Sequence, residues 1–404
     1  MTGRDIRILA LLSLLIILVY AGLGLLFVDL VLLSPDVSSA EIVYPPHGFL
    51  TVEGEGITVQ ASAAGRNLVR SELWVDEALV ETLTSDSAAG LAAWSVAHSW
   101  SPQGSGRHQL VVKVYSREGG MLNSPVTVVD VIPMGRIAFA SDRDGNYEIY
   151  TMRTDGREVV RLTDGPEQDR EPSCGSAGVM LFSSTAIGGG ADIWLLEPES
   201  TEATNLTRAL GGDYSPRWAP DGETIGFVSD RHRPAQLYLM TSDGRGQTQL
   251  TRQESSVEQP SWAPDGSALA FASKRDGNWD IFNISVEDGN TVRLTEDPAR
   301  DWYPAWSPRN DQIAFTSDRG GRQQIYVMEA DGTEPRRLTA FPVGAEQPQW
   351  SADGEWIVFV AYTGRGDGLK TREVYIMDSD GRDPTRLTDN VFDDTEPVWC
   401  QQNE

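Results

Sequence analysis

A unit of 44 residues recurs along most of the chain, and no other feature restricts the possible folds as strongly. The threonine of a Leu-Thr pair marks the unit, with four successive spacings of 44 residues and a last spacing of 49, at Thr163, Thr207, Thr251, Thr295, Thr339 and Thr388. A tryptophan keeps the same schedule at Trp218, Trp262, Trp306, Trp350 and Trp399, and Cys174 stands 44 residues before the first of them. Fixed periods of this length are typical of solenoids and propellers, whose units bury their faces only against one another.

Each unit contains four short strand-like segments and no helical periodicity. One unit has these segments at 259–263, 268–273, 280–284 and 291–295, with Asp-Gly turn sequences after the first and the third. Asp and Gly supply the backbone angles that tight turns need. Four antiparallel strands per unit, arranged radially, form a propeller blade. We expect alternating apolar side chains to fill the space between blades, among them Leu269, Phe271, Ile281 and Phe282.

The order of the strand types predicts six blades. Strands of the Ile-x-Phe type begin near Ile137, Met180, Ile225, Leu269, Ile313 and Ile357, and strands of the Pro-x-Trp type lie at Pro172, Pro216, Pro260, Pro304, Pro348 and Pro397. The region opens on the first of these types and closes on the second. The C-terminal segment 396–400 should therefore pair beside 136–141 and complete the first blade, which closes the ring.

The repeat also carries a family resemblance. The pattern P-x-W-(S/A)-P-D-G-x-x-I-x-F-x-S-D-R, followed by I-Y-x-M-x-x-D-G and R-L-T, resembles the TolB-type (WD-like) propeller repeat over roughly residues 134–404. This resemblance implies an extracytoplasmic six-bladed propeller that binds proteins or short peptides and lacks catalytic activity. The chain departs from the family's namesake in its N-terminal region, so a role in the Tol–Pal envelope system does not follow from the resemblance.

The N-terminal region predicts a membrane anchor. Residues 8–28 contain no charged side chain, and about 20 apolar residues suffice to cross a bilayer. Arg4 and Arg7 precede this tract, so residues 1–7 should be cytoplasmic, 8–33 transmembrane and the rest extracytoplasmic, giving a single-pass protein of the cell membrane. The alternative is a cleaved signal sequence with its cleavage site at 38–40, although apolar cores of such sequences are usually shorter.

Residues 40–133 do not repeat and predict a separate Ig-like β-sandwich. Apolar and polar residues alternate in several short segments, as at Ile57, Val59 and Ala61. Six or seven such strands with turns every 8–12 residues are the pattern of this fold. The predicted fold class is therefore all-β: a transmembrane helix, an Ig-like sandwich over 40–133 and a six-bladed propeller over 134–404.

The charge of the chain restricts its partners. The formal net charge is −26, which repels nucleic acid and anionic lipid headgroups, so we expect no nucleic-acid binding. Acids also gather in the segments that enter each Pro-x-Trp strand and should surround one mouth of the central channel. With neighbouring aromatic residues, the predicted ligand-binding set is Asp169, Glu171, Asp213, Tyr214, Glu258, Asp301, Trp302, Tyr303, Glu346, Asp393, Asp394 and Glu396.

Three interpretations of this acidic mouth remain open. A concave acidic site with aromatic side chains suits a basic or polar peptide, and its oxygens also suit a hard cation such as calcium. Alternatively, the acids are solvated loop residues of an acidic chain. The basic residues of the neighbouring loops, which include Arg143, Arg231, Arg233, Lys274, Arg275, Arg319 and Arg322, are expected to pair with aspartates between blades. The longer loop 362–373 of the last blade is a second candidate for recognition.

The sequence argues against catalysis and against a firmly bound cofactor. It has four histidines, with one in the propeller, and it lacks a G-x-S-x-G nucleophile elbow. We therefore expect a non-enzymatic binding protein with a protein or peptide partner. The alternatives are a sensory or regulatory ectodomain of a larger envelope assembly and a propeller-based hydrolase or lyase. Cys174 and Cys400 belong to adjacent strands and form either a disulfide or two small buried residues.

Overall fold

A computed structural model describes residues 37–186, 189–309, 311–364 and 370–400. The predicted transmembrane segment 8–33 lies outside these residues. Within the described part of the chain, no helix is long and apolar enough to cross a membrane. The described residues divide into two compact units: the first comprises residues up to 103 and 107–131, the second 104–106 and those from 132 onward, and each has its own core.

The first unit is all-β and is organised around one long strand. The 19-residue strand β3 pairs antiparallel with β1 and β5 through its first half and with β4 and β6 through its second half. Its strands are β1 Val37–Tyr44, β2 Phe49–Val52, β3 Ile57–Val75, β4 Ala78–Thr84, β5 Leu91–Trp100, β6 Gly106–Ser116, β7 Met121–Asn123 and β8 Thr127–Ile132.

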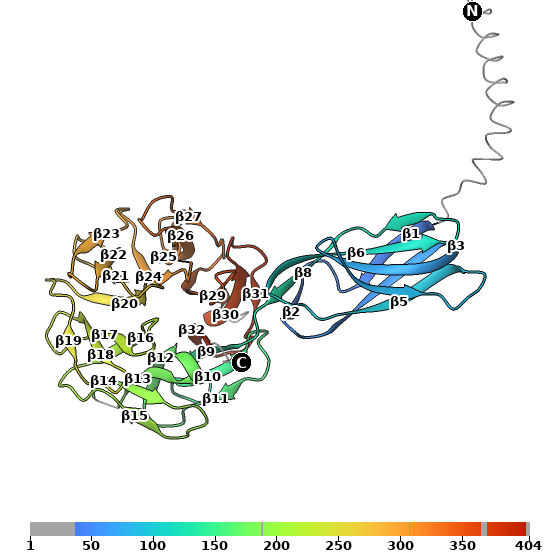
Figure 1. Ribbon diagram of the computed structural model, residues 1–404. Helices are drawn as coiled ribbons and strands as arrows, with labels where there is room; N and C mark the ends of the chain where they lie inside the picture. The colour runs from blue at the N-terminus through green and yellow to red at the C-terminus, as the bar shows by residue number, and fades with distance from the viewer. Residues whose placement is uncertain (1–36, 187–188, 310, 365–369, 401–404) are drawn as a thin grey trace, which may run out of the picture. The chain divides into compact units, whose positions relative to one another are not determined.

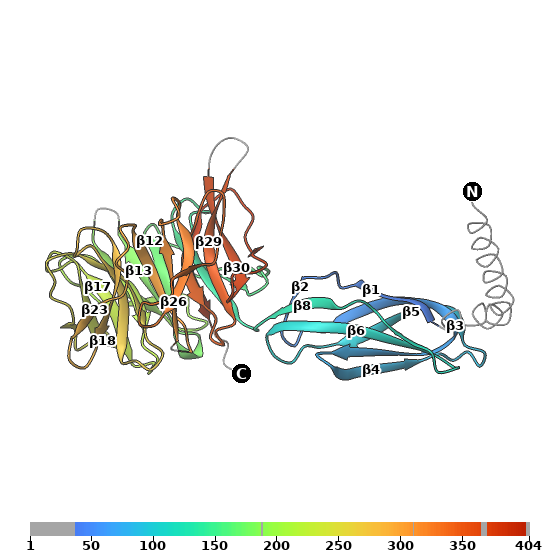
Figure 2. The same ribbon diagram turned by 90° about the horizontal axis from the view of Figure 1, so that it is seen from above.

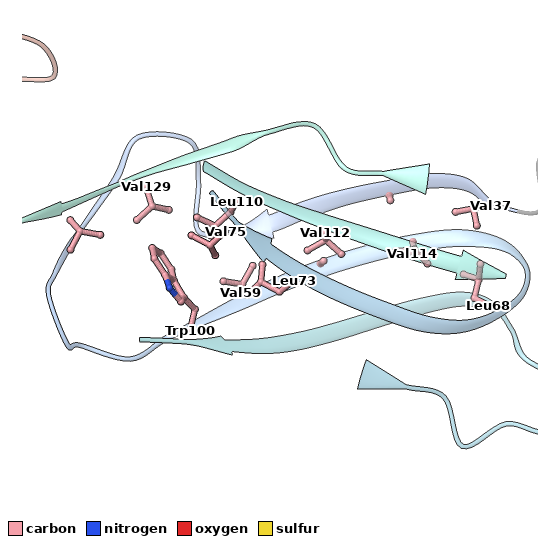
Figure 3. Close-up of a cluster of buried hydrophobic side chains, with 14 residues drawn as sticks. Val37, Val59, Leu68, Leu73, Val75, Trp100, Leu110, Val112, Val114 and Val129 are labelled. Carbon is pink, nitrogen blue, oxygen red and sulfur yellow. The ribbon is translucent and has the colours of Figure 1, made fainter. Parts of the chain in front are cut away.

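Alternating side chains of these strands form a single apolar core. Val59, Leu73, Leu110 and Val112 are 0% exposed and belong to one cluster with Trp100. Figure 3 shows these side chains in a row between the strands. Period-2 alternation places every second residue of a strand on one face, which explains why the exposed residues between them are polar or small.

The second unit is a propeller of six four-stranded antiparallel sheets (Figure 1). We number the blades 1 to 6 in the order in which the chain enters them. Blade 1 consists of β9 Arg136–Ser141, β10 Glu148–Arg153, β11 Val160–Arg161 and β32 Asp394–Cys400. Blade 2 consists of β12 Gln168–Cys174, β13 Met180–Thr185, β14 Ala191–Leu196 and β15 Ala203–Asn205, with one 3-10 turn at Ser176–Gly178. Blade 3 consists of β16 Asp213–Trp218, β17 Thr224–Ser229, β18 Gln236–Thr241 and β19 Thr248–Gln249.

The remaining blades follow the same plan. Blade 4 consists of β20 Val257–Trp262, β21 Ala268–Ser273, β22 Asp280–Ser285 and β23 Thr291–Arg293. Blade 5 consists of β24 Asp301–Trp306, β25 Gln312–Ser317, β26 Gln324–Glu329 and β27 Arg336–Arg337. Blade 6 consists of β28 Ala345–Trp350, β29 Trp356–Gly364, β30 Lys370–Asp378 and β31 Thr385–Arg386.

The predicted ring closure is confirmed. Strand β32 pairs antiparallel with β9, with Trp399 opposite Ile137 and Val398 opposite Ala138. The innermost strands β32, β12, β16, β20, β24 and β28 each contact the innermost strands of both neighbouring blades. The six-bladed count inferred from the repeat is therefore correct.

The repeated residues hold the blades together. An aromatic pair on the second and third strands faces the preceding blade in five blades, as in Phe271 and Phe282, whose ring centroids are 5.8 Å apart. The hydroxyl of each repeat threonine accepts a hydrogen bond from a backbone N–H of its blade's third strand, as Thr295 does from Ile281 at 2.9 Å. These contacts account for the recurrence of Phe and Thr without any ligand.

Candidate functional site

The innermost strand of every blade contains a bulge immediately before its proline. In blade 3, Tyr214 pairs with Val228 and Arg217 with Gly226, so that β16 holds one extra residue between these pairs. The residue before the proline has a left-handed backbone, with φ between 51° and 59° in all six blades. Proline has no N–H for the strand ladder and is tolerated at a bulge. We call these positions the bulge residues: Glu171, Ser215, Gln259, Tyr303, Gln347 and Glu396.

The bulge residues connect neighbouring blades around the centre of the propeller, where Figure 1 shows the innermost strands. Glu171 accepts hydrogen bonds from the backbone N–H and the hydroxyl of Ser215, at 2.7 and 2.6 Å. Glu396 accepts one from the backbone N–H of Glu171 at 2.8 Å. The same contact from a backbone N–H to the preceding bulge side chain recurs at Tyr303–Gln259 (3.0 Å) and Glu396–Gln347 (2.9 Å). The bulge residues therefore form a polar ring in which hydrogen bonds join four of the six neighbouring pairs.

A cavity of about 320 Å³ lies beside this ring, over blades 4, 5 and 6. We call it the mouth cavity. Its lining combines two carboxylates, three aromatic rings and three other polar side chains: Glu258, Glu346, Trp279, Trp302, Tyr303, Gln259, Arg300 and Gln323. Four of the residues predicted from the sequence, Glu258, Trp302, Tyr303 and Glu346, thus meet in one cavity.

The mouth cavity has an excess of negative charge. Glu258 has neither a hydrogen-bond partner nor an ion-pair partner among the described residues, and burial, followed by the charge of Glu171, raises its pKa. Burial also raises the pKa of Glu346, although the hydroxyl of Tyr362 donates to it at 2.7 Å. Arg300 is the cation of the lining, and Asp318 binds it at 2.8 Å. A cationic group between these carboxylates and the aromatic rings would be favoured by both.

Three predicted mouth acids lie inside the blades instead. Asp213, Asp301 and Asp394 are 0% exposed. Each forms an ion pair with an arginine that follows the second strand of its own blade: Arg231–Asp213 (2.7 Å), Arg319–Asp301 (2.9 Å) and Arg143–Asp394 (2.9 Å). For these three arginines the expected pairing with aspartate is present, but it occurs within a blade and not between blades.

The other predicted residues have mixed positions. Glu171 and Glu396 are bulge residues, and their carboxylates are occupied by backbone and side-chain donors. Tyr214 is half-buried against the cluster between blades 3 and 4. Asp393 binds Arg372 at 2.7 Å, and Asp169 is buried in blade 2.

Two arginines near the channel were not predicted from the sequence. Arg170 binds Glu396 at 2.7 Å and lies over the ring of Tyr147, 4.2 Å from its centroid. Arg372 donates to the hydroxyl of the same tyrosine at 2.9 Å. Arg170 stands two residues before its proline, as Glu258 and Glu346 do in their blades, so an alignment of the repeats would have identified it.

The long loop of the last blade is partly described. Strands β29 and β30 have nine residues each, against six in most second and third strands, and Figure 2 shows their hairpin extending beyond the other blades. Tyr362 and Arg372 belong to this extension and reach Glu346 and Asp393. The described part of the loop therefore contacts Glu346 of the mouth cavity through Tyr362, while residues 365–369 lie outside the described residues.

A disulfide replaces one tryptophan of the repeat. In blades 4, 6 and 1, the repeat tryptophan donates its indole N–H to a carbonyl of the preceding blade, as Trp262 does to Arg217 at 3.1 Å. In blade 2 this position is Cys174, which is bonded to Cys400 with a Cα–Cα distance of 5.2 Å. The two side chains therefore face each other, and a covalent bond joins blades 1 and 2 at the position where an indole hydrogen bond joins blades 4, 6 and 1 to the blades before them.

One arrangement in the first unit resembles a nucleophile triad. The hydroxyl of Ser71 lies 2.9 Å from Nε2 of His98, and Nδ1 of His98 lies 3.1 Å from Glu81. Ser71 and His98 are both 0% exposed, so a substrate has no access to the hydroxyl. Burial also lowers the pKa of His98. We interpret these contacts as satisfying buried polar groups of β3 and β5. Over the described ranges there is no group of three or more His, Cys, Asp or Glu residues that could hold a metal ion.

Comparisons with known proteins agree on the propeller. Residues 244–371 match the PD40 family model, described as TolB beta propeller domain. An uncharacterised protein of Agrobacterium fabrum is 28% identical over 87 residues, which are 22% of this chain and 30% of that protein. The matched segment thus spans less than a third of this relative.

Solved structures show the same fold at low sequence identity. TolB from Acinetobacter baumannii has a TM-score of 0.58 and 20% identity, covering 74% of this chain and 80% of its own. A TolB candidate from Agrobacterium tumefaciens has a TM-score of 0.52 and 23% identity, covering 63% and 89%. Hydrazine synthase of Kuenenia stuttgartiensis also matches, with a TM-score of 0.54, 16% identity and coverage of 66% and 47%. The fold therefore occurs in an enzyme as well and does not decide whether this protein is one. The second unit is therefore a six-bladed β-propeller with the fold of the TolB structures, and residues 244–371 of it match the TolB propeller family model.

Proposed function

We propose that this protein is a non-enzymatic binding protein whose propeller recognises a protein or peptide partner at the mouth cavity. The observation that carries the proposal is Glu258, a half-buried carboxylate without a partner among the described residues, in a cavity with Trp279, Trp302 and Tyr303. A buried carboxylate that is not paired is costly in the free protein, and a bound cation removes that cost.

The partner should present a basic side chain to this cavity. Glu258 and Glu346 attract a lysine or an arginine, and aromatic faces bind cations when water is excluded. The TolB-like propeller supports a protein or peptide partner over a small substrate. A cavity of about 320 Å³ holds one side chain, so the remaining contact area would come from the rim, including the β29–β30 hairpin.

We further propose that the protein is anchored in the cell membrane with both β units outside the cytoplasm. The apolar tract 8–28 and the arginines before it support this arrangement. The first unit would be an Ig-like spacer that holds the propeller away from the membrane. Alkaline extraction of membranes, with mass measurement of the mature protein, tests the anchor: release into the soluble fraction or cleavage after residue 40 would exclude it.

Crosslinked capture tests the binding site. The full-length tagged chain is compared in native membranes with a Glu258→Gln/Trp302→Ala variant, and with Glu223→Gln as a matched loss of charge on an exposed turn. We expect a basic partner to be captured by the wild type and by Glu223→Gln but not by the double variant. Each captured protein is then purified and its affinity for the three chains is measured. Equal affinity for all three would refute the mouth cavity as the recognition site.

A further inference from the structure

A second candidate site lies between blades 1 and 2, whereas the mouth cavity lies over blades 4, 5 and 6. It follows from comparing equivalent positions in the blades. In blades 1, 3 and 5 a buried aspartate of the innermost strand binds an arginine of the same blade, as Asp213 binds Arg231. Blade 2 has the aspartate, Asp169, but not the arginine.

The register of the strands identifies the missing residue. Asp169 pairs with Ser184 as Asp213 pairs with Ser229, and the arginine of blade 3 is two residues after that serine. The corresponding position in blade 2 is Ala186. The whole segment from Thr185 to Ala191 reads TAIGGGA and contains no basic residue. Blade 4 shows the converse, because Arg275 is present but Val257 replaces the aspartate.

In blades 1, 3 and 5 this arginine fills a defined space. The guanidinium of Arg231 lies over the aromatic pair of its blade, 5.0 Å from the centroid of Tyr238, while its Nε donates to Ser229 and its Nη2 to Asp213. Arg319 and Arg143 repeat this arrangement, with centroid distances of 5.1 Å to Tyr326 and 4.6 Å to Tyr150. A planar cation between a carboxylate and a ring face therefore occupies this position in blades 1, 3 and 5.

Blade 2 has a cavity of about 670 Å³ around the equivalent groups. Its floor includes Asp169, Ser184 and the aromatic residues Phe182 and Trp194, which are opposite each other on β13 and β14. Residues 161–165 of blade 1 form one wall of the cavity. Glu167 lies in the segment that connects blade 1 to blade 2 and also lines the cavity. A volume of this size is typical of ligand sites.

Asp169 lacks a partner for one of its oxygens. The residue is 6% exposed, and its Oδ1 is buried without a hydrogen-bond partner among the described residues. Burial raises the pKa of Asp169 to about 6, against the lowering effect of the Ser184 and Thr163 hydroxyls. Asp164 and Glu167 add negative charge to the lining, and the basic residue of the lining, Arg161, is held by Glu148 at 3.0 Å and Asp164 at 2.7 Å.

We propose that this cavity binds a guanidinium group supplied by a ligand, which takes the place that an arginine of the chain occupies in blades 1, 3 and 5. The guanidinium would donate to Asp169 and Ser184 and lie against Phe182 and Trp194. Arg supplies planar, bidentate donors that match a carboxylate and also stack on aromatic rings, which an ammonium does less well. The ligand is an arginine side chain of a peptide or a small guanidino compound.

Calorimetric titration of the full-length chain in mild detergent tests this site with named probes. N-acetyl-arginine amide is compared with N-acetyl-citrulline amide, which has the same shape without the charge, and with N-acetyl-lysine amide. An Ala-Arg-Ala peptide and agmatine distinguish a peptide source from a small molecule. Two variants act on the site by opposite means: Asp169→Asn removes the carboxylate charge, and Ala186→Arg restores the arginine found in blades 1, 3 and 5. All titrations are repeated in a Glu258→Gln background, which removes the unpaired carboxylate of the mouth cavity, so that binding at this second site is measured separately.

We expect N-acetyl-arginine amide to bind this site in the Glu258→Gln background at least tenfold more tightly than the citrulline probe does. Both site variants should bind it at least tenfold more weakly, and wild-type affinity should fall as the pH drops below about 6, where Asp169 becomes protonated. Equal binding of the arginine and citrulline probes, or undiminished binding by Ala186→Arg, would overturn the proposal. So would the absence of binding by the wild type. Because the Glu258→Gln background lacks the carboxylate of the mouth cavity and keeps Asp169, failure here is distinct from failure of the mouth cavity.

Discussion

Glu171 accepts hydrogen bonds from both the backbone N–H and the hydroxyl of Ser215, a residue 44 positions later in the chain and one blade further round the ring. The left-handed backbone of Ser215, with φ of 51°, turns its N–H away from its own strand ladder and toward the neighbouring blade. Such a conformation costs roughly 1–3 kcal/mol for a residue other than glycine. The cross-blade hydrogen bonds offset this cost, so the polar lining of the channel is part of what joins the blades.

Replacing Glu396 with alanine should destabilise the propeller by about 2–4 kcal/mol. The change removes the ion pair with Arg170 and leaves the backbone N–H of Glu171 without its acceptor. Denaturant unfolding of the full-length chain measures the effect. Glu254→Ala, at an exposed position, controls for the loss of one carboxylate. Equal unfolding midpoints for the two variants would show that the bulge contacts contribute nothing to stability.

Asp169→Asn and Asp213→Asn should have opposite effects at pH 7. The raised pKa of Asp169, about 6 against 3.8 in the unfolded chain, means that folding favours its protonated form. Because the folded protein holds the Asp169 proton more tightly than the unfolded chain does, the free energy of unfolding falls by roughly 3 kcal/mol as the pH rises from about 4 to about 6. Asp169→Asn removes this loss and should stabilise the protein at pH 7 but hardly change it below pH 4.

Asp213→Asn should instead destabilise the protein by about 3 kcal/mol or more, because it leaves Arg231 without its buried counter-charge. Unfolding of both variants and the wild type at pH 3.5, 5 and 7 measures the contrast. If Asp169→Asn lowers the free energy of unfolding at pH 7 as Asp213→Asn does, then the Asp169 carboxylate has a cationic partner in solution and its pKa is not raised.

The blade count could be predicted from the sequence because the repeated residues make structural contacts that recur from blade to blade. Thr295 accepts the N–H of Ile281, and Trp262 donates to Arg217 of the preceding blade. These roles do not depend on a ligand, so the residues that perform them recur at a fixed spacing. The order of the strand types then predicted the ring closure, because the first blade has four strands only if the C-terminal strand β32 pairs with β9.

The composition of the mouth could be predicted only in part, because the bulge adds one residue to each innermost strand. Residues before and after a bulge do not keep the alternation of a regular strand. From the sequence, Asp213 and Glu258 are equivalent acids near a proline, but the first is three residues before its proline and the second is two residues before it. One position points into the blade and the other lines the mouth cavity, and the sequence pattern does not distinguish them without the register.

Thr295→Val should destabilise the propeller by about 1–3 kcal/mol. The side chains have nearly the same shape, but valine leaves the buried N–H of Ile281 without the acceptor that the hydroxyl of Thr295 provides at 2.9 Å. Thr204→Val, at an exposed position of β15, is the matched control and should change stability by less than about 0.5 kcal/mol. The free energies of unfolding from urea titrations compare the two variants. Equal effects would mean that the repeat threonine recurs for a reason other than this hydrogen bond.

Removing the disulfide should loosen the closure of the ring. The Cys174–Cys400 bond joins residues that are 226 positions apart, and for a loop of this length the chain-entropy model gives a stabilisation of about 5 kcal/mol, with about 2–5 kcal/mol usual for native disulfides. A reductant should therefore lower the melting temperature of the wild type. A Cys174→Ser/Cys400→Ser double variant should melt at the temperature of the reduced wild type, with or without the reductant. Hydrogen exchange should locate the loss in β32 and β12, the two strands that the bond connects. Two alkylated thiols in the native, unreduced protein would contradict the bond itself. Unchanged exchange in β32 after reduction would instead show that pairing with β9 alone keeps the ring closed.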